Sequence, residues 1–137
     1  MDKKREALAN FAEVDLEDVT EDGNEYIVDD KTYLVLTDSE ADEATAEYIQ
    51  DSVWAFNADF VAEHTKAGSD ITEMIKSFQE TRYEDANEPL IALIEDMAEF
   101  IDDAVTADGR GHFLSSYDGD ENEIMLEGTY YFIYRID

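Results

Sequence analysis

The clearest pattern along the chain is a repeat of apolar residues at helical spacing before its midpoint. These residues recur at spacings of 3, 4, 3 and 4, which places them on one face of an α-helix. They are Ala46, Ile49, Val53, Phe56 and Phe60. Thr37 and Glu40 precede the stripe with the spacing of a capping box. The pattern predicts a long helix from about Ser39 to His64.

Three further segments carry helical patterns. Residues 3–14 predict a short first helix, and Asp70 with Glu73 repeats the capping-box spacing before a shorter helix. Asn87 and Pro89 open the third main helix, because proline is tolerated in the first turn. The apolar face of that third helix consists of Leu90, Ile94, Met97, Ile101 and Val105.

Strand patterns lie toward both ends of the chain. Residues 25–28 and 32–36 are rich in β-branched and aromatic side chains and predict a hairpin, and residues 123–126 and 129–136 predict a second one. In the last strand aromatic residues fall on both faces. The glycine-containing stretch 107–119 is expected to be a loop. We therefore expect an α+β fold, with an antiparallel sheet of two hairpins packed against three main helices. Residues 1–137 are expected to form a single domain.

The charge of the chain is far outside the usual range. Thirty-seven Asp and Glu residues face nine Lys and Arg residues, a formal net charge of −28. A magnitude of about 2–8 is enough to keep a small domain dispersed. Sixteen aromatic residues exclude a disordered acidic tail, since such tails are poor in aromatics. The charge is therefore interpreted as functional, although an ordinary solvated surface, as in a protein of a high-salt cytoplasm, remains an alternative.

Composition also limits the partners and the chemistry. Nucleic acid and anionic membranes would repel this chain, so neither is expected as a direct partner. The absence of cysteine excludes disulfides and thiolate chemistry. No apolar run approaches the ~20 residues of a membrane span, and no apolar segment follows the basic start of the chain. We expect a cytoplasmic protein. The last hairpin is expected to have a free edge and exposed aromatics, including Tyr131, through which two copies of the chain could pair as a homodimer.

Acidic residues are concentrated on the polar sides of two predicted helices. Like charges at these spacings destabilise a helix, so stability alone does not explain them. Double-stranded DNA carries one negative charge per ~1.7 Å of axis, and its binding proteins meet it with basic clefts. Two ridges of fixed negative charge are therefore predicted to stand in for phosphates at such a cleft. The first ridge is Glu40, Glu43, Glu47 and Asp51, and the second is Glu95, Glu99, Asp102 and Asp103.

The stretch 109–119 is the basis of three alternative functions: a binding module, an enzyme and a divalent-ion-binding protein. A binding module would use a patch of Arg110, His112, Tyr117 and Asp118. Residue types of a catalytic triad occur there, but the nucleophile elbow of a hydrolase does not, so no enzyme activity is expected. Asp118, Asp120 and Asn122 match the start of a calcium loop, but Glu123 occupies the glycine position. A divalent-ion-binding protein is the least favoured alternative, and no metal ligands and no cofactor are predicted.

Four segments resemble a family of small acidic proteins encoded by bacteriophages, for which no activity is established. They are residues 33–44 (YLVLTDSEADEA), 53–57 (VWAFN), 108–119 (DGRGHFLSSYDG) and 130–135 (YYFIYR). The resemblance implies a phage origin and action in the cytoplasm of an infected bacterial host. In overall character the chain is also similar to phage DNA mimics. Together these observations predict an anti-defence inhibitor that acts as a DNA mimic on a host nuclease, such as a CRISPR effector or a restriction enzyme.

Overall fold

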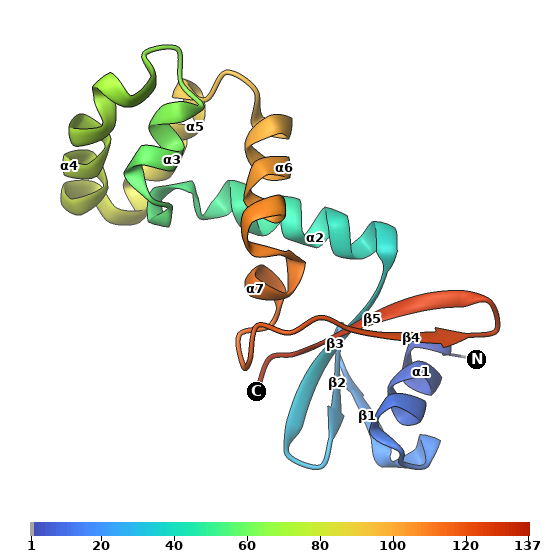
Figure 1. The fold of residues 1–137 in the computed structure, drawn as a ribbon. Helices are drawn as coiled ribbons and strands as arrows, with labels where there is room; N and C mark the ends of the chain where they lie inside the picture. The colour runs from blue at the N-terminus through green and yellow to red at the C-terminus, as the bar shows by residue number, and fades with distance from the viewer. Residues whose placement is uncertain (1) are drawn as a thin grey trace. The chain divides into compact units, whose positions relative to one another are not determined.

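The computed structural model describes residues 2–137, which form two compact units. The sheet unit comprises the residues up to Thr45 together with Asp108–Asp137, and the helical unit comprises Ala46–Ala107. Figure 1 shows the strands and helices of each unit. The single domain expected over residues 1–137 stays a prediction.

The sheet unit is built on five antiparallel strands in the order β1-β2-β3-β5-β4. Both predicted hairpins are present, and a strand that the sequence did not predict, β1, extends the first of them. The α+β fold is therefore confirmed. The strands are β1 (Val19–Asp22), β2 (Glu25–Val28), β3 (Lys31–Thr37), β4 (Asn122–Leu126) and β5 (Thr129–Arg135).

Apolar residues are buried on both faces of this sheet. Helix α1 (Lys3–Ala12) places Leu8 in a core with Tyr131 and Ile133 of β5. On the other face, Phe132 and Tyr134 pack with residues of α7 (Arg110–Leu114) and of the first part of α2 (Asp38–Asp51). Because neighbouring strand residues point to opposite faces, β5 needs apolar side chains at consecutive positions. The aromatic alternation in the last strand is explained by this double burial.

The last hairpin has a free edge, but this edge is not the aromatic strand that the sequence suggested for pairing. Strand β5 lies between β3 and β4, so the edge of the last hairpin is β4. Tyr131, which was expected to be exposed, is 8% accessible and belongs to the core. The exposed residues of β4 include Glu123 and Met125, and a charged side chain on an edge strand disfavours pairing with another chain.

The predicted long helix from Ser39 to His64 is wrong. Helix α2 ends at Asp51, a 3-10 turn follows at Val53–Ala55, and α3 spans Ala58–Glu63. The new helix begins because the Asn57 side chain accepts hydrogen bonds from the backbone N–H groups of Asp59 and Phe60, at 2.9 and 3.3 Å. The apolar spacing continues through this break, so periodicity alone could not reveal it.

The predicted third helix is divided in the same way, into α5 (Asn87–Leu93) and α6 (Met97–Asp108). Asp96 accepts a hydrogen bond from the N–H of Glu99 at 3.2 Å and so caps α6. The capping box expected at Asp70 and Glu73 is absent. Helix α4 (Thr72–Arg82) instead continues from a 3-10 turn at Gly68–Ile71 and has no side-chain cap. A further 3-10 turn, Tyr83–Ala86, links α4 to α5.

The predicted loop over residues 107–119 is also wrong in part, because Arg110–Leu114 forms helix α7. Gly111 lies inside this helix although glycine is a poor helix former. A Cβ atom at this position would lie 2.5 Å from the carbonyl oxygen of Gly119 and 2.8 Å from the backbone nitrogen of Glu121. Close approach of two backbone segments therefore requires glycine here.

Candidate functional site

The acidic side chains lie at the surface throughout the described chain. Of the 37 Asp and Glu residues, none is buried and 33 are exposed. The four that are half-buried are Asp2, Glu6, Glu25 and Glu40. The negative charge is therefore presented to solvent by a folded chain.

The helical unit carries most of its negative charge without neutralisation. It contains fifteen Asp and Glu residues against three Lys and Arg residues, a formal net charge of −12. None of these three cations, Lys66, Lys76 and Arg82, forms an ion pair with a described residue. The only carboxylate of this unit in a described ion pair is Asp103, which contacts His64.

The sheet unit differs, because several of its cations are engaged internally. Lys3 pairs with Glu6 and Glu127, and Lys4 pairs with Glu40 at 2.9 Å. The side-chain hydrogen bond to Glu127 raises the pKa of Lys3. These contacts fix basic side chains against the surface of the unit, so they do not offer free positive charge to a partner.

The first predicted ridge is made of residues with two different roles. Glu40 accepts a hydrogen bond from the backbone N–H of Thr37 at 2.9 Å, which confirms the predicted capping box. That bond, together with the hydrogen bond from Lys4, lowers the pKa of Glu40. Glu43, Glu47 and Asp51 are exposed on α2. Glu40 and Glu43 belong to the sheet unit and Glu47 and Asp51 to the helical unit, so the ridge consists of two pairs in different units.

We expect Glu40→Gln to lower the free energy of unfolding by about 0.5–1 kcal/mol at pH 7, because it weakens a cap and an exposed ion pair. A lowered pKa means that the unfolded state takes up the proton first as pH falls. The stabilisation is therefore present above the unfolded pKa and is lost as pH falls through the folded one. Urea unfolding at pH 7 and near pH 2.5 checks this. Glu43→Gln is the control and should cost nothing at either pH; equal losses for both variants would contradict the assignment.

The second predicted ridge is rearranged by the break between α5 and α6. Glu95 lies outside α6, where its backbone N–H donates to the carbonyl oxygen of His64 at 3.0 Å. Glu99, Asp102 and Asp103 lie on α6 and are exposed. From Glu99 to Asp103 the helix rises about 6 Å, so the three carboxylates are on average about 3 Å apart along the axis. That spacing is close to the ~3.4 Å between successive charges along one strand of duplex DNA.

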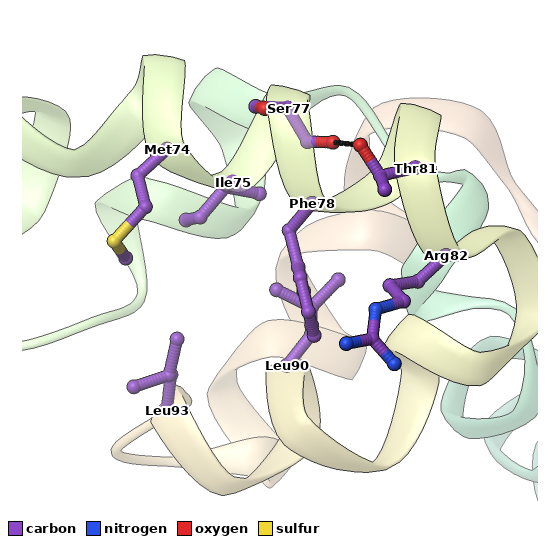
Figure 2. A pocket seen from close by; sticks show the side chains of 8 residues that line it. All are labelled: Met74, Ile75, Ser77, Phe78, Thr81, Arg82, Leu90 and Leu93. Carbon is purple, nitrogen blue, oxygen red and sulfur yellow. Dashed lines mark hydrogen bonds between the residues drawn. The ribbon is translucent and has the colours of Figure 1, made fainter.

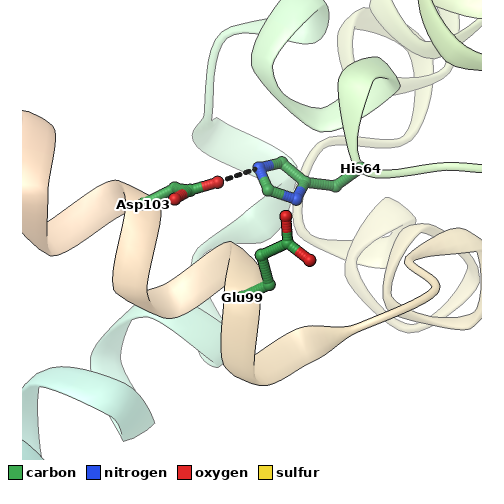
Figure 3. A group of neighbouring side chains, drawn as sticks. All are labelled: His64, Glu99 and Asp103. Atoms are coloured by element: carbon green, nitrogen blue, oxygen red, sulfur yellow. Dashed lines mark ion pairs between the residues drawn. The ribbon is translucent and has the colours of Figure 1, made fainter.

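His64 is the residue of this face that the sequence did not assign. Its Nε2 atom lies 3.3 Å from Oδ2 of Asp103, and its side chain is only 10% exposed. The ring forms a three-ring cluster with Phe60 and Phe100, with centroid distances of 5.1 Å to each. Figure 3 shows the carboxylates of Glu99 and Asp103 directed toward the imidazole. The spacing of four residues between Glu99 and Asp103 was the available signal, but no sequence pattern connected it with His64.

The alternative patch at 109–119 is largely occupied by internal contacts. The Arg110 guanidinium contacts Asp38 and Asp42 at 2.9 Å and Glu121 at 2.8 Å, and it lies 4.6 Å from the ring centroid of Phe132. Burial opposes the charge, but the hydrogen bonds to Glu121 and Asp38 outweigh it and raise the pKa of Arg110. Arg110 therefore acts as an internal clamp of the sheet unit.

Asp118 is likewise engaged within the chain. Its carboxylate accepts a hydrogen bond from the N–H of Asp120 at 3.0 Å, and the Ser115 hydroxyl lies 2.8 Å away. These bonds lower the pKa of Asp118. Tyr117 is exposed, with the Arg135 guanidinium 3.5 Å from its ring centroid. Of the four patch residues, His112, Tyr117 and Asp118 are exposed, but Asp118 is engaged in hydrogen bonds within the sheet unit.

The structure does not bring together the residues of a catalytic triad or of a calcium loop in this stretch. Ser115 is buried beside Asp118, while His112 is exposed and its ring contacts Phe113, so the triad residue types are not brought into a relay. The amide nitrogen of Asn122 donates to the carbonyl oxygen of Ile133 at 3.2 Å. Within residues 2–137, the only group of three His or carboxylate side chains placed to share an ion is His64, Glu99 and Asp103.

A cavity of about 500 Å³ lies on the helical unit (Figure 2). Its lining is mainly apolar and includes Met74, Phe78, Leu90 and Leu93 from α4 and α5. Arg82 is the only ionisable side chain among the described residues that line it, so the cavity holds no acid–base pair. We assign it no catalytic role.

No helix in the described part of the chain has the length and apolar character needed to cross a bilayer. The chain matches no protein-family model, no curated protein and no solved structure.

Proposed function

We propose that the protein is an anti-defence inhibitor that acts as a DNA mimic, occupying the basic nucleic-acid-binding channel of a host nuclease. The observation that carries the proposal is the helical unit, whose net charge of −12 is exposed and lacks ion pairs with its own lysines and arginines. A carboxylate that is not paired internally is available to a Lys or Arg of another protein. The phage setting rests on the resemblance of the four segments given above.

A rigid scaffold is the second requirement of a mimic. Asp96 caps α6 and the backbone of Glu95 is bonded to that of His64, so the start of the acidic face is held in place. Charges fixed in this way lose little conformational entropy on binding, and long-range attraction speeds association. The contact residues that we propose are Glu95, Glu99, Asp102 and Asp103, with Glu47 and Asp51 of the same unit as a second set.

The binding module that uses residues 109–119 is the competing proposal. It is disfavoured because Arg110 and Asp118 are committed to contacts within the sheet unit. Salt separates the two functions, because binding through phosphate-like charges weakens steeply as salt rises whereas a neutral patch is little affected.

Affinity capture tests the proposal. The immobilised protein is incubated with a nuclease-treated bacterial lysate and washed at increasing salt. We expect nucleic-acid-binding proteins to be retained at about 50 mM salt, to be released by about 200–300 mM, and to be displaced by added duplex DNA. Retention that resists both salt and duplex DNA would contradict the proposal.

A further inference from the structure

Three ligand-bearing side chains of the helical unit converge from two helices. His64 follows the C-terminal end of α3, while Glu99 and Asp103 lie one turn apart on α6. One ligand atom from each side chain lies within 4.8 Å of the other two. Two ligands of a tetrahedral ion bound at about 2.0–2.1 Å are about 3.3 Å apart. The Nε2 atom of His64 and Oδ2 of Asp103 are already separated by 3.3 Å.

The surroundings of His64 hold its ring in one place. The side chain is nine-tenths buried, and its ring contacts the rings of Phe60 and Phe100. A ring oriented by its neighbours loses little freedom when it binds a metal ion. Glu99 is exposed, so its carboxylate has room to rotate toward the same point.

The set of donors selects a class of ion. Imidazole nitrogen binds Zn²⁺, Fe²⁺, Ni²⁺ and Cu²⁺, whereas Ca²⁺ and Mg²⁺ prefer oxygen ligands only. One imidazole and two carboxylates, with positions left for water, resemble the three-ligand arrangement of open zinc sites. The negative potential of the protein concentrates cations near the site.

We propose that His64, Glu99 and Asp103 form a binding site for one divalent transition-metal ion. Glu99 and Asp103 are also contact residues of the proposed inhibitory function, but metal binding depends only on these two carboxylates and His64, so it is tested with Zn²⁺ alone and without the target. The 37 carboxylates would bind cations weakly in any case, so a test must report on His64 itself.

The chain contains two histidines, and this allows a direct experiment. Protein labelled with ¹⁵N-histidine is titrated with Zn²⁺ in a large excess of Mg²⁺, which occupies nonspecific carboxylate sites. We expect the ring nitrogens of His64 to shift with saturation at one equivalent, while those of His112 stay unchanged. Glu99→Gln combined with Asp103→Asn should weaken binding about 100-fold or more.

The matched control is Glu95→Gln combined with Asp102→Asn, which removes the same charge from the same face and should bind Zn²⁺ within about threefold of the unmodified protein. The changed side chains are exposed, and circular dichroism verifies the fold of both variants. The proposal is overturned if the two double variants lose affinity equally, if both histidines respond in parallel, or if His64 does not respond to Zn²⁺.

Discussion

Replacing Arg110 with alanine is expected to lower the free energy of unfolding by about 2–4 kcal/mol, the largest stability effect of any surface substitution that we predict. Its guanidinium contacts three carboxylates and is only 12% exposed. Without it, Asp38, Asp42 and Glu121 would repel one another with no cation between them. The estimate is below that for a fully buried ion pair because the aspartates are largely exposed. Urea unfolding at pH 7, followed by circular dichroism, measures the change.

Two further variants identify the cause of this loss. Arg82→Ala removes an exposed arginine that forms no ion pair with a described residue and lies 6.0 Å from the Phe78 ring centroid, and it should change stability by less than about 0.5 kcal/mol. Adding Asp38→Asn and Asp42→Asn to the Arg110 variant should recover part of the loss, since these changes remove the repulsion. If the free energy of unfolding of Arg110→Ala lies within about 0.5 kcal/mol of the unmodified protein's, the contacts of Arg110 with the three carboxylates do not stabilise the fold.

Reversing the charges of the acidic face formed by α6 and the residues just before it is expected to have the largest effect on function. Changing Glu95, Glu99, Asp102 and Asp103 to lysine should weaken binding to the captured nuclease at least about 100-fold at low salt. Charge pairs across protein interfaces contribute about 1.5 kcal/mol or more each, and every 1.4 kcal/mol is tenfold in affinity. Equilibrium binding to the purified target at fixed ionic strength measures the loss.

The control carries the same change in net charge at other exposed positions of the helical unit. Glu80, Glu84, Asp85 and Glu88 lie at the end of α4, in the turn after it and in the first turn of α5. Changing these four to lysine should weaken binding less than tenfold. Equal losses for both variants would mean that bulk charge, and not the face on α6, determines affinity.

The fold was predictable where local patterns determine it. Both hairpins and the double-sided last strand follow from the alternation of apolar residues, and the Thr37–Glu40 capping box was identified correctly. The helix breaks were missed because Asn57 and Asp96 cap new helices inside uninterrupted apolar stripes. Helix α7 was missed because three glycines favour a loop, and only the packing of Gly111 against a distant segment explains the helix.

The candidate site was predicted less well, because charge patterns do not show which charges are neutralised. Arg110 has the same appearance in sequence as a free surface charge, yet it is bonded within the sheet unit. Glu40 was assigned both to the capping box and to the ridge, and its cap and its ion pair with Lys4 engage it within the same unit. The contact of His64 with Glu99 and Asp103 depends on how α3 and α6 pack, which spacing along the chain cannot reveal. Glu99, Asp102 and Asp103 are exposed on α6, as the sequence predicted, and their function stays a proposal.

Competition with duplex DNA tests the central claim most directly. A labelled duplex is bound to the purified target nuclease, and the protein is added at increasing concentration and at several salt concentrations. We predict complete displacement of the duplex, with an apparent affinity that falls steeply as salt rises. We predict no displacement by a protein in which both acidic faces are changed to lysine, the first being Glu95, Glu99, Asp102 and Asp103 and the second Glu47 and Asp51. A ternary complex that retains the duplex, or displacement that survives reversal of both faces, would contradict the claim that carboxylates here take the place of phosphates.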